Sequence, residues 1–360
     1  MQTTQSPNAG QTSSQMETPI QLHPLDEHNQ KLASNVHPPT WTNPTPSGEY
    51  HLVVIGAGTA GLVTAAGAAG LGARVALIER ELMGGDCLNV GCVPSKGIIG
   101  AARVAATVRD AAPFGVNVSE GAAVDFGKAM ERMRKKRADI SPVDSAQRFK
   151  DLGIDVFFGQ GSFVDDDTVS VTTSSGEVTQ LKFKKAVIAS GARAAAPPIN
   201  GMDSVNYLTN ENLFSLTELP KRFGIVGSGP IGSEMAQSFA RFGSEVFLFE
   251  RSDHILSRED SDAAAVVQQQ FEKDGVNLVL NSKDMQLAPS GDQVSVKIVQ
   301  NGNPKEVLVD QLLIAVGRAP NIDGLNLEKL NVKYHKRGVE VNDNMQTTNP
   351  RIYAAGDICS

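Results

Sequence analysis

The sequence predicts an α/β protein with two Rossmann-like dinucleotide-binding domains, the second inserted into the first and each accompanied by a small antiparallel β layer. Two observations support this fold class. In residues 50–79, a Gly-x-Gly-x-x-Gly motif follows an apolar strand-like run and opens a helix-like segment. Residues 222–250 (RFGIVGSGPIGSEMAQSFARFGSEVFLFE) repeat the same order of strand, turn, helix and strand. Because each such unit holds one nucleotide, the repeat implies two nucleotide ligands.

Length and composition narrow the class of protein. The chain has 360 residues, 33 Lys and Arg against 40 Asp and Glu for a net charge of −7, 41% hydrophobic residues and three cysteines. These values are typical of a globular protein of two or more domains, and the acidic balance argues against nucleic acid or an anionic membrane as partner. Three cysteines cannot build a disulfide scaffold. Since no secretion signal is recognisable at the start, we expect a cytoplasmic protein.

One nearly uncharged stretch, residues 52–78, has the length of a membrane span, which takes roughly 20 apolar residues. Six glycines interrupt it, and two short Val/Ile-rich runs flank a Gly/Ala-rich middle. This pattern predicts a strand, helix and strand in a protein core, where parallel strands are apolar throughout. We therefore expect no membrane partner.

The first part of the chain is predicted to be a tail followed by the first nucleotide unit. Residues 1–47 are rich in Gln, Ser, Thr, Asn and Pro and lack an apolar period, so we expect a disordered polar tail in which Trp41 could dock on the body. A strand at residues 50–55, a helix from Thr59 and a strand ending at Glu79 follow.

The next segment is predicted to be mainly helical. A loop at residues 84–96 (GGDCLNVGCVPSK) opens a helix that stops before Pro113, and residues 124–152 predict a long helix with a kink near Pro142. Residues 132–137 (RMRKKR) form a basic run inside that helix. Because a methionine interrupts the run among helix formers, we expect a solvated helix face rather than a nucleic-acid signal.

The remaining patterns set the domain boundaries. Short alternating strands at residues 154–190 predict an antiparallel layer whose last strand rejoins the first sheet, and residues 276–300 predict a second small layer. We place the first domain at residues 48–195, the second at 196–318, and the return to the first domain at 319–360.

The first glycine motif is Gly56-Ala-Gly58-Thr-Ala-Gly61, with Glu79 at the end of the next strand. The first glycine allows the tight turn, the second lets the backbone approach a pyrophosphate, and the third lets the helix pack on the strand. The helix N-terminus attracts the phosphate charge, and the carboxylate accepts a hydrogen bond from a ribose hydroxyl. Since all of these parts are present in order, we predict that the motif binds a dinucleotide.

The second motif, Gly227-Ser-Gly229-Pro-Ile-Gly232, has the same context, with Glu250 at the end of its second strand. An acid at that place disfavours the extra 2′-phosphate of NADP and suits the free hydroxyls of NAD. The positive charge of the neighbouring Arg251 would instead favour the 2′-phosphate of NADP. The motif therefore predicts an NAD(P)H site and favours NADH.

Cys87 and Cys92 lie five residues apart where a loop meets a helix, a spacing that predicts either a redox pair or half of a metal site. A metal site needs two more ligands, and Cys359 with scattered histidines offers no second pair at ligand spacing. Redox chemistry is therefore favoured, and no metal site is expected. The start of the helix at Cys92 and the positive charge of Lys96 one turn later would favour the thiolate of Cys92.

Taken together and in this order, the motifs resemble the class I pyridine nucleotide–disulfide oxidoreductases, which include dihydrolipoyl dehydrogenase, glutathione reductase and mercuric reductase. The resemblance covers residues 50–357 and rests on GGDCLNVGCVPSK, the two glycine motifs, VIASGARAAAPP, LLIAVGRAPN and RIYAAGD. The cysteine motif and the tail before the first strand are most similar to the mercuric-reductase-like branch.

The resemblance implies FAD at the first unit, NAD(P)H at the second, and a role for individual residues. Cys92 would face the flavin ring, Cys87 would face the substrate, and Lys96 with Glu234 would form an ion pair beside the ring. Asp357 would hold the ribitol chain of the flavin. The cofactor-binding residues implied are Gly56, Gly58, Gly61, Glu79, Gly191, Asp357, Gly227, Gly229, Gly232, Glu250 and Gly317.

The reaction implied by the resemblance passes electrons from NAD(P)H through the flavin to a Cys87–Cys92 disulfide, and on to a small disulfide or a thiophilic metal ion. In this family a His–Glu base comes from the C-terminal interface domain of a partner subunit, so a homodimer is expected. The chain ends three residues after Asp357, and we expect that domain to be missing from it. A dihydrolipoyl-dehydrogenase-like enzyme and a flavin-binding remnant without turnover are the alternatives.

Overall fold

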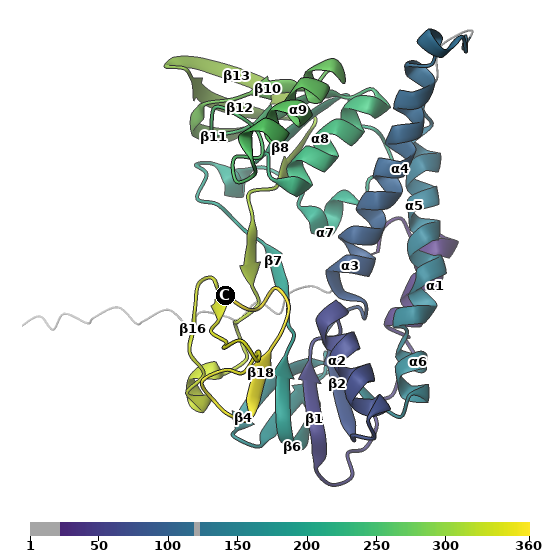
Figure 1. Ribbon diagram of the computed structural model, residues 1–360, viewed down its shortest axis with the longest axis vertical. Helices are drawn as coiled ribbons and strands as arrows, with labels where there is room; N and C mark the ends of the chain where they lie inside the picture. Colours follow the sequence, from purple (N-terminus) through teal and green to yellow (C-terminus); the bar gives the residue numbers. More distant parts are fainter. Residues whose placement is uncertain (1–21, 119–122) are drawn as a thin grey trace, which may run out of the picture.

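The computed structural model describes residues 22–118 and 123–360 as two α/β lobes stacked along the long axis of the molecule (Figure 1). Two long helices, α4 (Cys92–Arg109) and α5 (Phe126–Ile140), run side by side along one flank. No helix in the described ranges has the length and apolar character that a membrane span needs.

The lower lobe in Figure 1 is built on a parallel sheet in the order β3-β2-β1-β6-β18. Its strands are β1 (Tyr50–Ile55), β2 (Val75–Glu79), β3 (Asp155–Phe158), β6 (Val178–Ile188) and β18 (Ile352–Ala354). The first half of the long β6 pairs antiparallel with β5 (Thr168–Thr172), which pairs with β4 (Gln160–Asp165). One strand therefore joins the nucleotide sheet to the antiparallel layer, and β18 brings the end of the chain back to the first sheet.

The upper lobe repeats this plan with a sheet in the order β10-β9-β8-β14. Its elements are β8 (Arg222–Val226), α8 (Pro230–Phe242), β9 (Glu245–Phe249), α9 (Ser261–Lys273), β10 (Asn277–Val279) and β14 (Gln311–Ile314). The antiparallel layer consists of β11 (Ser282–Ser290), β12 (Gln293–Gln300) and β13 (Asn303–Val309). It extends nine residues beyond the predicted end at 300, because a second hairpin adds β13.

The chain crosses between the lobes twice, through β7 (Ala192–Ala194) and β15 (Arg318–Pro320), which pair antiparallel. The predicted boundary at 195 directly follows β7, and the one at 318 falls on the first residue of β15. The other elements are α2 (Thr59–Gly70), α3 (Gly85–Asn89), α6 (Ala146–Asp151), α7 (Asn210–Leu213), β16 (Tyr334–His335), β17 (Gly338–Val339) and four 3₁₀ turns at Ala112–Phe114, Ser141–Asp144, Met202–Ser204 and Leu327–Leu330.

The parallel sheet of the lower lobe is apolar on both faces, as its sequence predicts. Val53 of β1 packs in the core shared with the antiparallel layer and the C-terminal segment, while its neighbour Val54 packs in the core on the other face. Leu32 and Val36 of the N-terminal segment belong to that second core and are fully buried. The segment before β1 is therefore part of the folded lobe.

The prediction of a disordered tail is wrong for residues 22–47, since they contain the helix α1 (Glu27–Val36) packed against α5. Asp26 caps α1 by accepting a hydrogen bond from the Asn29 amide at 2.9 Å. The segment has few apolar residues, and its polar side chains make buried hydrogen bonds that a search for apolar periodicity does not detect. Residues 1–21 lie outside the described ranges, so the prediction remains untested there.

The basic run of α5 is not a uniformly solvated face, so this prediction is also wrong in part. Arg134 and Arg137 are 6% and 3% exposed. Arg134 Nε donates to Asp26 Oδ2 at 2.5 Å, and the Arg137 guanidinium donates to Asn29 and Asn89. These two arginines are buried because α1 covers them, which the local sequence of α5 cannot indicate.

Three further sequence expectations can be compared with the structure. Trp41 does dock on the body, and its Nε1 donates to the carbonyl of Val156 at 3.1 Å. The kink near Pro142 is a complete break, where a 3₁₀ turn separates α5 from α6. The predicted cysteine loop contains the short helix α3 before α4 begins.

We expect Asp26→Asn to lower the free energy of unfolding by about 1–3 kcal/mol, because the nearly buried Arg134 loses its charged partner. Burial raises the pKa of Asp26, but the Asn29 amide and Arg134 outweigh it and hold the pKa below its ordinary value. The contribution of Asp26 is therefore present above pH of about 4 and lost as the pH falls further. Urea unfolding at pH 7 and at pH 3 measures both effects.

Asp139→Asn is the matched control for this variant. Asp139 pairs with Lys31 of the same helix α1, but both side chains are largely exposed. We expect a much smaller change, because exposed pairs contribute little. An equal effect of the two variants at pH 7 would contradict the importance of the Asp26–Arg134 pair.

Candidate functional site

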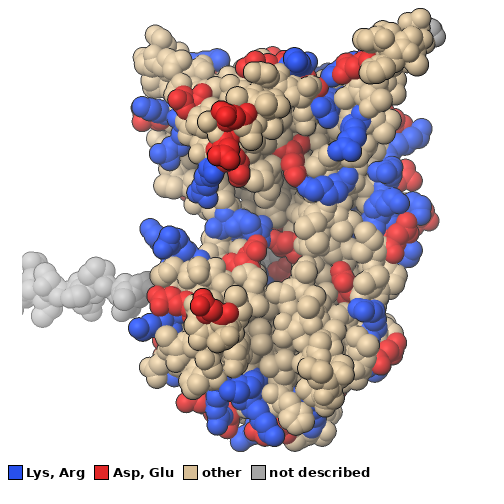
Figure 2. Space-filling view, viewed as in Figure 1, with Lys and Arg blue, Asp and Glu red and all other residues tan. Residues whose placement is uncertain are grey.

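A cavity of about 750 Å³ lies where the two lobes and the start of α4 meet. Figure 2 shows a hollow at mid-height of the molecule, with acidic atoms visible inside it. The predicted site residues that line the cavity are Gly56, Glu79, Cys87, Cys92, Lys96, Gly191, Glu234 and Asp357. Those that do not line it are Gly58, Gly61, Gly227, Gly229, Gly232, Glu250 and Gly317. The fold thus gathers both cysteines, the Lys96–Glu234 pair and four of the six predicted FAD residues around one space.

The turn between β1 and α2 requires two of its three glycines for packing. Gly56 has φ +105°, and a Cβ there would lie 2.2 Å from the carbonyl oxygen of Ala189. A Cβ on Gly61 would lie 1.8 Å from the oxygen of Gly56. Gly58 is different, because a Cβ there would meet only the Cα of Gly85 at 3.7 Å, an ordinary contact. The absence of a side chain at Gly58 leaves the backbone open to a ligand, as a pyrophosphate site requires.

The turn between β8 and α8 has the same construction. Gly227 has φ +97°, and a Cβ there would lie 2.6 Å from the oxygen of Ala315. A Cβ on Gly232 would lie 1.9 Å from the oxygen of Gly227, whereas a Cβ on Gly229 would meet nothing within 4 Å. In both units the middle glycine is therefore the one that the fold itself does not need.

Glu79 is the last residue of β2 and Glu250 directly follows β9, and each accepts hydrogen bonds from its glycine turn. Glu79 accepts from the amides of Ala57 and Glu81, both at 2.8 Å, and its burial raises the pKa of its carboxyl group. Glu250 accepts from the amide and hydroxyl of Ser228 at 3.1 and 2.5 Å. Burial raises the pKa of Glu250, but these hydrogen bonds outweigh it and hold the pKa below its ordinary value.

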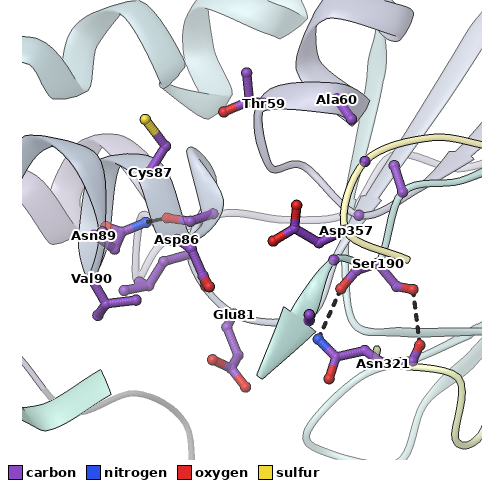
Figure 3. A pocket seen from close by; sticks show the side chains of 18 of the residues that line it. Thr59, Ala60, Glu81, Asp86, Cys87, Asn89, Val90, Ser190, Asn321 and Asp357 are labelled. Carbon is purple, nitrogen blue, oxygen red and sulfur yellow. Dashed lines mark hydrogen bonds between the residues drawn. The ribbon is translucent and has the colours of Figure 1, made fainter. Parts of the chain in front are cut away.

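The two cysteines belong to a segment that we call the redox loop, residues 81–92. Cys87 lies in α3 and is half-buried, whereas Cys92 is exposed as the first residue of α4; both are free thiols. Burial, together with a hydrogen bond to Cys92, raises the pKa of Cys87 to about 11, while the Thr59 hydroxyl acts in the opposite direction. Figure 3 shows Cys87 and Thr59 at the edge of the pocket. Cys87 is therefore held in its protonated form near neutral pH.

Lys96 and Glu234 meet across the junction of the lobes. Lys96 Nζ of α4 lies 2.6 Å from Glu234 Oε1 of α8, and the two side chains are 60% and 36% exposed. A pair this exposed contributes little to stability. Its geometry agrees with the ion pair that the sequence motifs imply, while its role beside a flavin stays a prediction.

Three further residues of the sequence motifs line the cavity, although the sequence analysis gave them no role: Asp86, Arg318 and Asn321. Arg318 donates from Nε to Asp357 Oδ2 at 3.2 Å and from Nη2 to Asp86, so it connects two carboxylates that line the cavity. Asn321 donates to the Ser190 carbonyl at 2.9 Å (Figure 3). Arg318 and Asn321 both occur in LLIAVGRAPN, and Asp86 directly precedes Cys87, so proximity to known motifs was the available signal.

Two nucleotide turns of the same design, placed around a dithiol, define the class of protein as an oxidoreductase with two dinucleotide units. Residues 50–360 match the pyridine nucleotide-disulphide oxidoreductase family. The chain belongs to this family. Its fold class is the predicted one, and the family uses FAD and NAD(P)H.

Curated relatives and solved structures carry several different names. The chain is 36% identical over 312 residues to a mercuric reductase of Staphylococcus aureus, covering 86% of this chain and 56% of the relative. It is 34% identical over 315 residues to a dihydrolipoyl dehydrogenase of Geobacillus stearothermophilus, covering 86% and 65%. A Cu(II) complex of the HOCl-induced flavoprotein disulfide reductase RclA from Escherichia coli superposes with a TM-score of 0.76 at 30% identity, covering 87% and 66%. The chain thus spans a little over half the length of the first relative.

The residues present fit FAD at the first unit. The open backbone at Gly58, the start of α2 and the cavity wall formed by Glu79 and Asp357 are the groups that would hold the pyrophosphate, ribose and ribitol of such a dinucleotide. Within the described residues, no group of three or more His, Cys, Asp or Glu side chains could hold a metal ion.

We expect Gly58→Ala to weaken FAD binding at least tenfold while the protein still folds, because the added Cβ enters the approach to the turn and meets no more than an ordinary contact within the chain. Gly58 is the N-cap residue of α2, a position where alanine is less favourable than glycine. The free energy of unfolding should therefore fall by about 1 kcal/mol or less. FAD titration of the apoprotein and thermal unfolding measure the two quantities.

Gly61→Ala is the control with the opposite result. Its Cβ would lie 1.8 Å from a backbone oxygen that cannot move without displacing α2. We expect this variant to lose folded protein rather than FAD affinity alone. A Gly58→Ala protein with wild-type FAD affinity would refute the assignment of the middle glycine to the ligand.

We expect iodoacetamide to label Cys92 well before Cys87 in the reduced protein. A pKa of about 11 leaves roughly one thousandth of Cys87 as thiolate at pH 8, and the thiolate is the reactive form. The initial rate for Cys87 should rise about tenfold per pH unit between pH 8 and 10. Fragmentation of the labelled peptide by mass spectrometry separates the two sites, and equal initial rates at pH 8 would contradict the raised pKa.

Proposed function

We propose that this chain is the cofactor-binding and dithiol part of an NAD(P)H-dependent flavoprotein reductase that delivers two electrons to a disulfide or a thiophilic metal ion. The observation that supports this most directly is that Cys87 and Cys92 line the same cavity as Glu79 and Asp357. A dithiol beside a flavin site needs no further group to exchange electrons with it. When bound, FAD supplies the two-electron relay between nicotinamide and the thiol pair.

The residues of the chain would divide the work as follows. Cys92, the exposed first residue of α4, would face the flavin. Cys87 would attack or ligate the acceptor as the interchange thiol. Lys96 would hold a positive charge near the flavin ring, kept in place by Glu234 at 2.6 Å.

NADH is the proposed donor. The carboxyl group of Glu250 has its pKa below the ordinary value and is anionic at neutral pH, so it would repel the 2′-phosphate of NADPH and accept hydrogen bonds from free ribose hydroxyls. Arg251 opposes this preference by its charge. The ratio of kcat/KM for NADH and NADPH measures it directly.

Among acceptors we favour a thiophilic metal ion, in line with the mercuric-reductase-like branch. A mercuric reductase is among the relatives, and the RclA structure is described as a Cu(II) complex. A dihydrolipoyl-dehydrogenase-like reaction is the second candidate, supported by the relatives of that name. A homodimer, a partner-supplied base, a cytoplasmic location and the boundaries at 195 and 318 are further proposals that follow from the family.

We expect the wild-type chain with FAD to develop the long-wavelength absorbance of a thiolate beside an oxidised flavin when two electrons are added, because Cys92 faces the ring. Cys92→Ser should lose this absorbance entirely, whereas Cys359→Ser should keep it. If Cys92→Ser retained the absorbance, the assignment of the thiols would be wrong.

Steady-state oxidation of NADH separates the candidate functions. Activity with Hg(II) in the presence of excess thiol supports the favoured reaction, and activity with lipoamide alone supports the second candidate. Electron transfer only to oxygen would support a flavin-binding remnant and overturn the reductase proposal for this chain. Cys87→Ser is the control that should abolish transfer to either acceptor.

A further inference from the structure

The N-terminal segment makes contacts with the redox loop that the glycine and cysteine motifs do not explain. The carbonyl of Val36, the last residue of α1, accepts from the amide of Met83 at 3.1 Å. The ring of His37 hydrogen-bonds to the carbonyl of Glu81. A segment that precedes the nucleotide unit is thus attached to the backbone on the N-terminal side of Cys87.

Arg137 of α5 makes the attachment on the other side of Cys87. Its Nη1 donates to the carbonyl of Asn89 at 2.6 Å, and its Nη2 donates to Asn29 Oδ1 of α1 at 2.8 Å. Asn29 is fully buried and is itself held, since its Nδ2 donates to Pro24 O at 2.8 Å. The guanidinium is therefore fixed between α1 and the redox loop.

Asn89 also hydrogen-bonds to other carbonyls of the redox loop and so restrains the loop backbone. It is 1% exposed, and its Nδ2 donates to the carbonyls of Met83 at 3.1 Å and Gly85 at 2.9 Å. It lies two residues after Cys87 and three before Cys92, and it lines the cavity (Figure 3). Hydrogen bonds from Asn29 through Arg137 to Asn89 thus fix the backbone on which both thiols are carried.

The burial of the Arg137 guanidinium is energetically unfavourable, so stability alone does not account for it. Arg137 makes no hydrogen bond to a carboxylate within the described residues, and burial with Arg134 nearby lowers its pKa to about 10. Its Nε and the Oδ1 of Asn89 are buried without partners. Apolar side chains of similar volume often replace buried charged groups without loss of stability. A role in fixing the loop explains why two directed hydrogen bonds are present here.

We propose that Arg137 is a positioning residue for the cysteine pair and that α1 sets its position through Asn29. The inference rests on the proposed function, in which Cys87 and Cys92 interconvert between dithiol and disulfide. Holding the loop raises the effective concentration of one thiol at the other and so favours the disulfide. Releasing the loop should shift the equilibrium toward the dithiol.

Equilibrium with dithiothreitol measures this effect on the full chain with FAD. The reaction breaks the Cys87–Cys92 bond and transfers two electrons and two protons from dithiothreitol, which closes its own ring disulfide. After acid quenching, mass-tagging of free thiols gives the dithiol fraction. The readout is independent of NADH turnover.

We expect Arg137→Met, which keeps the length of the side chain but not its donors, to shift the equilibrium constant three- to tenfold toward the dithiol; tenfold corresponds to 29.6 mV. Asn29→Ala should shift it in the same direction by a smaller factor. The double variant should equal Arg137→Met, because Asn29 acts through Arg137. If Arg137→Met does not fold, Asn29→Ala alone decides the direction.

Met130→Ala is the matched control, since Met130 is fully buried in the apolar core of the same helix and its side chain donates no hydrogen bond to the loop. It should lower stability without moving the equilibrium. An unchanged constant in Arg137→Met, a shift toward the disulfide, or an equal shift in Met130→Ala would overturn the inference while leaving the proposed function intact. A wild-type chain that forms no Cys87–Cys92 disulfide would overturn both.

Discussion

The close approach of each nucleotide-binding helix to the turn before it is the constraint on which the rest of the structure depends. Gly61 and Gly232 lie so near the carbonyls of Gly56 and Gly227 that one additional carbon at either place would lie within 2 Å of an oxygen. This packing puts the first turns of α2 and α8 directly at the ends of β1 and β8. Amides without helical partners are thereby directed into the space beyond the strands' ends, where a nucleotide phosphate would bind.

The helix α4 connects the cavity with the upper lobe. It begins at Cys92 beside the cavity and ends at Arg109, whose guanidinium lies 2.8 Å from Asp274 of the upper lobe. Arg241 of α8 binds the same carboxylate at 2.8 Å, and the side chain of Asp274 is fully buried. With Lys96 and Glu234 paired at the other end, α4 holds the thiols and the second nucleotide unit in a fixed relation.

The parts of this protein that could be predicted from its sequence are those encoded locally. A glycine turn, a cysteine pair and an acid at a strand end each occupy a few adjacent positions, and the structure places them as short-range patterns predict. The helix α1 and the burial of Arg134 and Arg137 were missed, because they depend on polar contacts over about a hundred positions that leave no period in the sequence. The bridge from Arg318 to Asp86 was missed for the same reason.

The pairing of β7 with β15 has a consequence for how such a molecule can be assembled. Ala194 and Arg318 are ladder partners, so the two points at which the upper lobe joins the lower one are neighbours at a spacing of about 5 Å. All five strands of the lower parallel sheet lie outside the interval between them. The chain therefore enters and leaves the upper lobe at one place, while the packing of α4 and α5 on that lobe supplies a second, non-covalent connection.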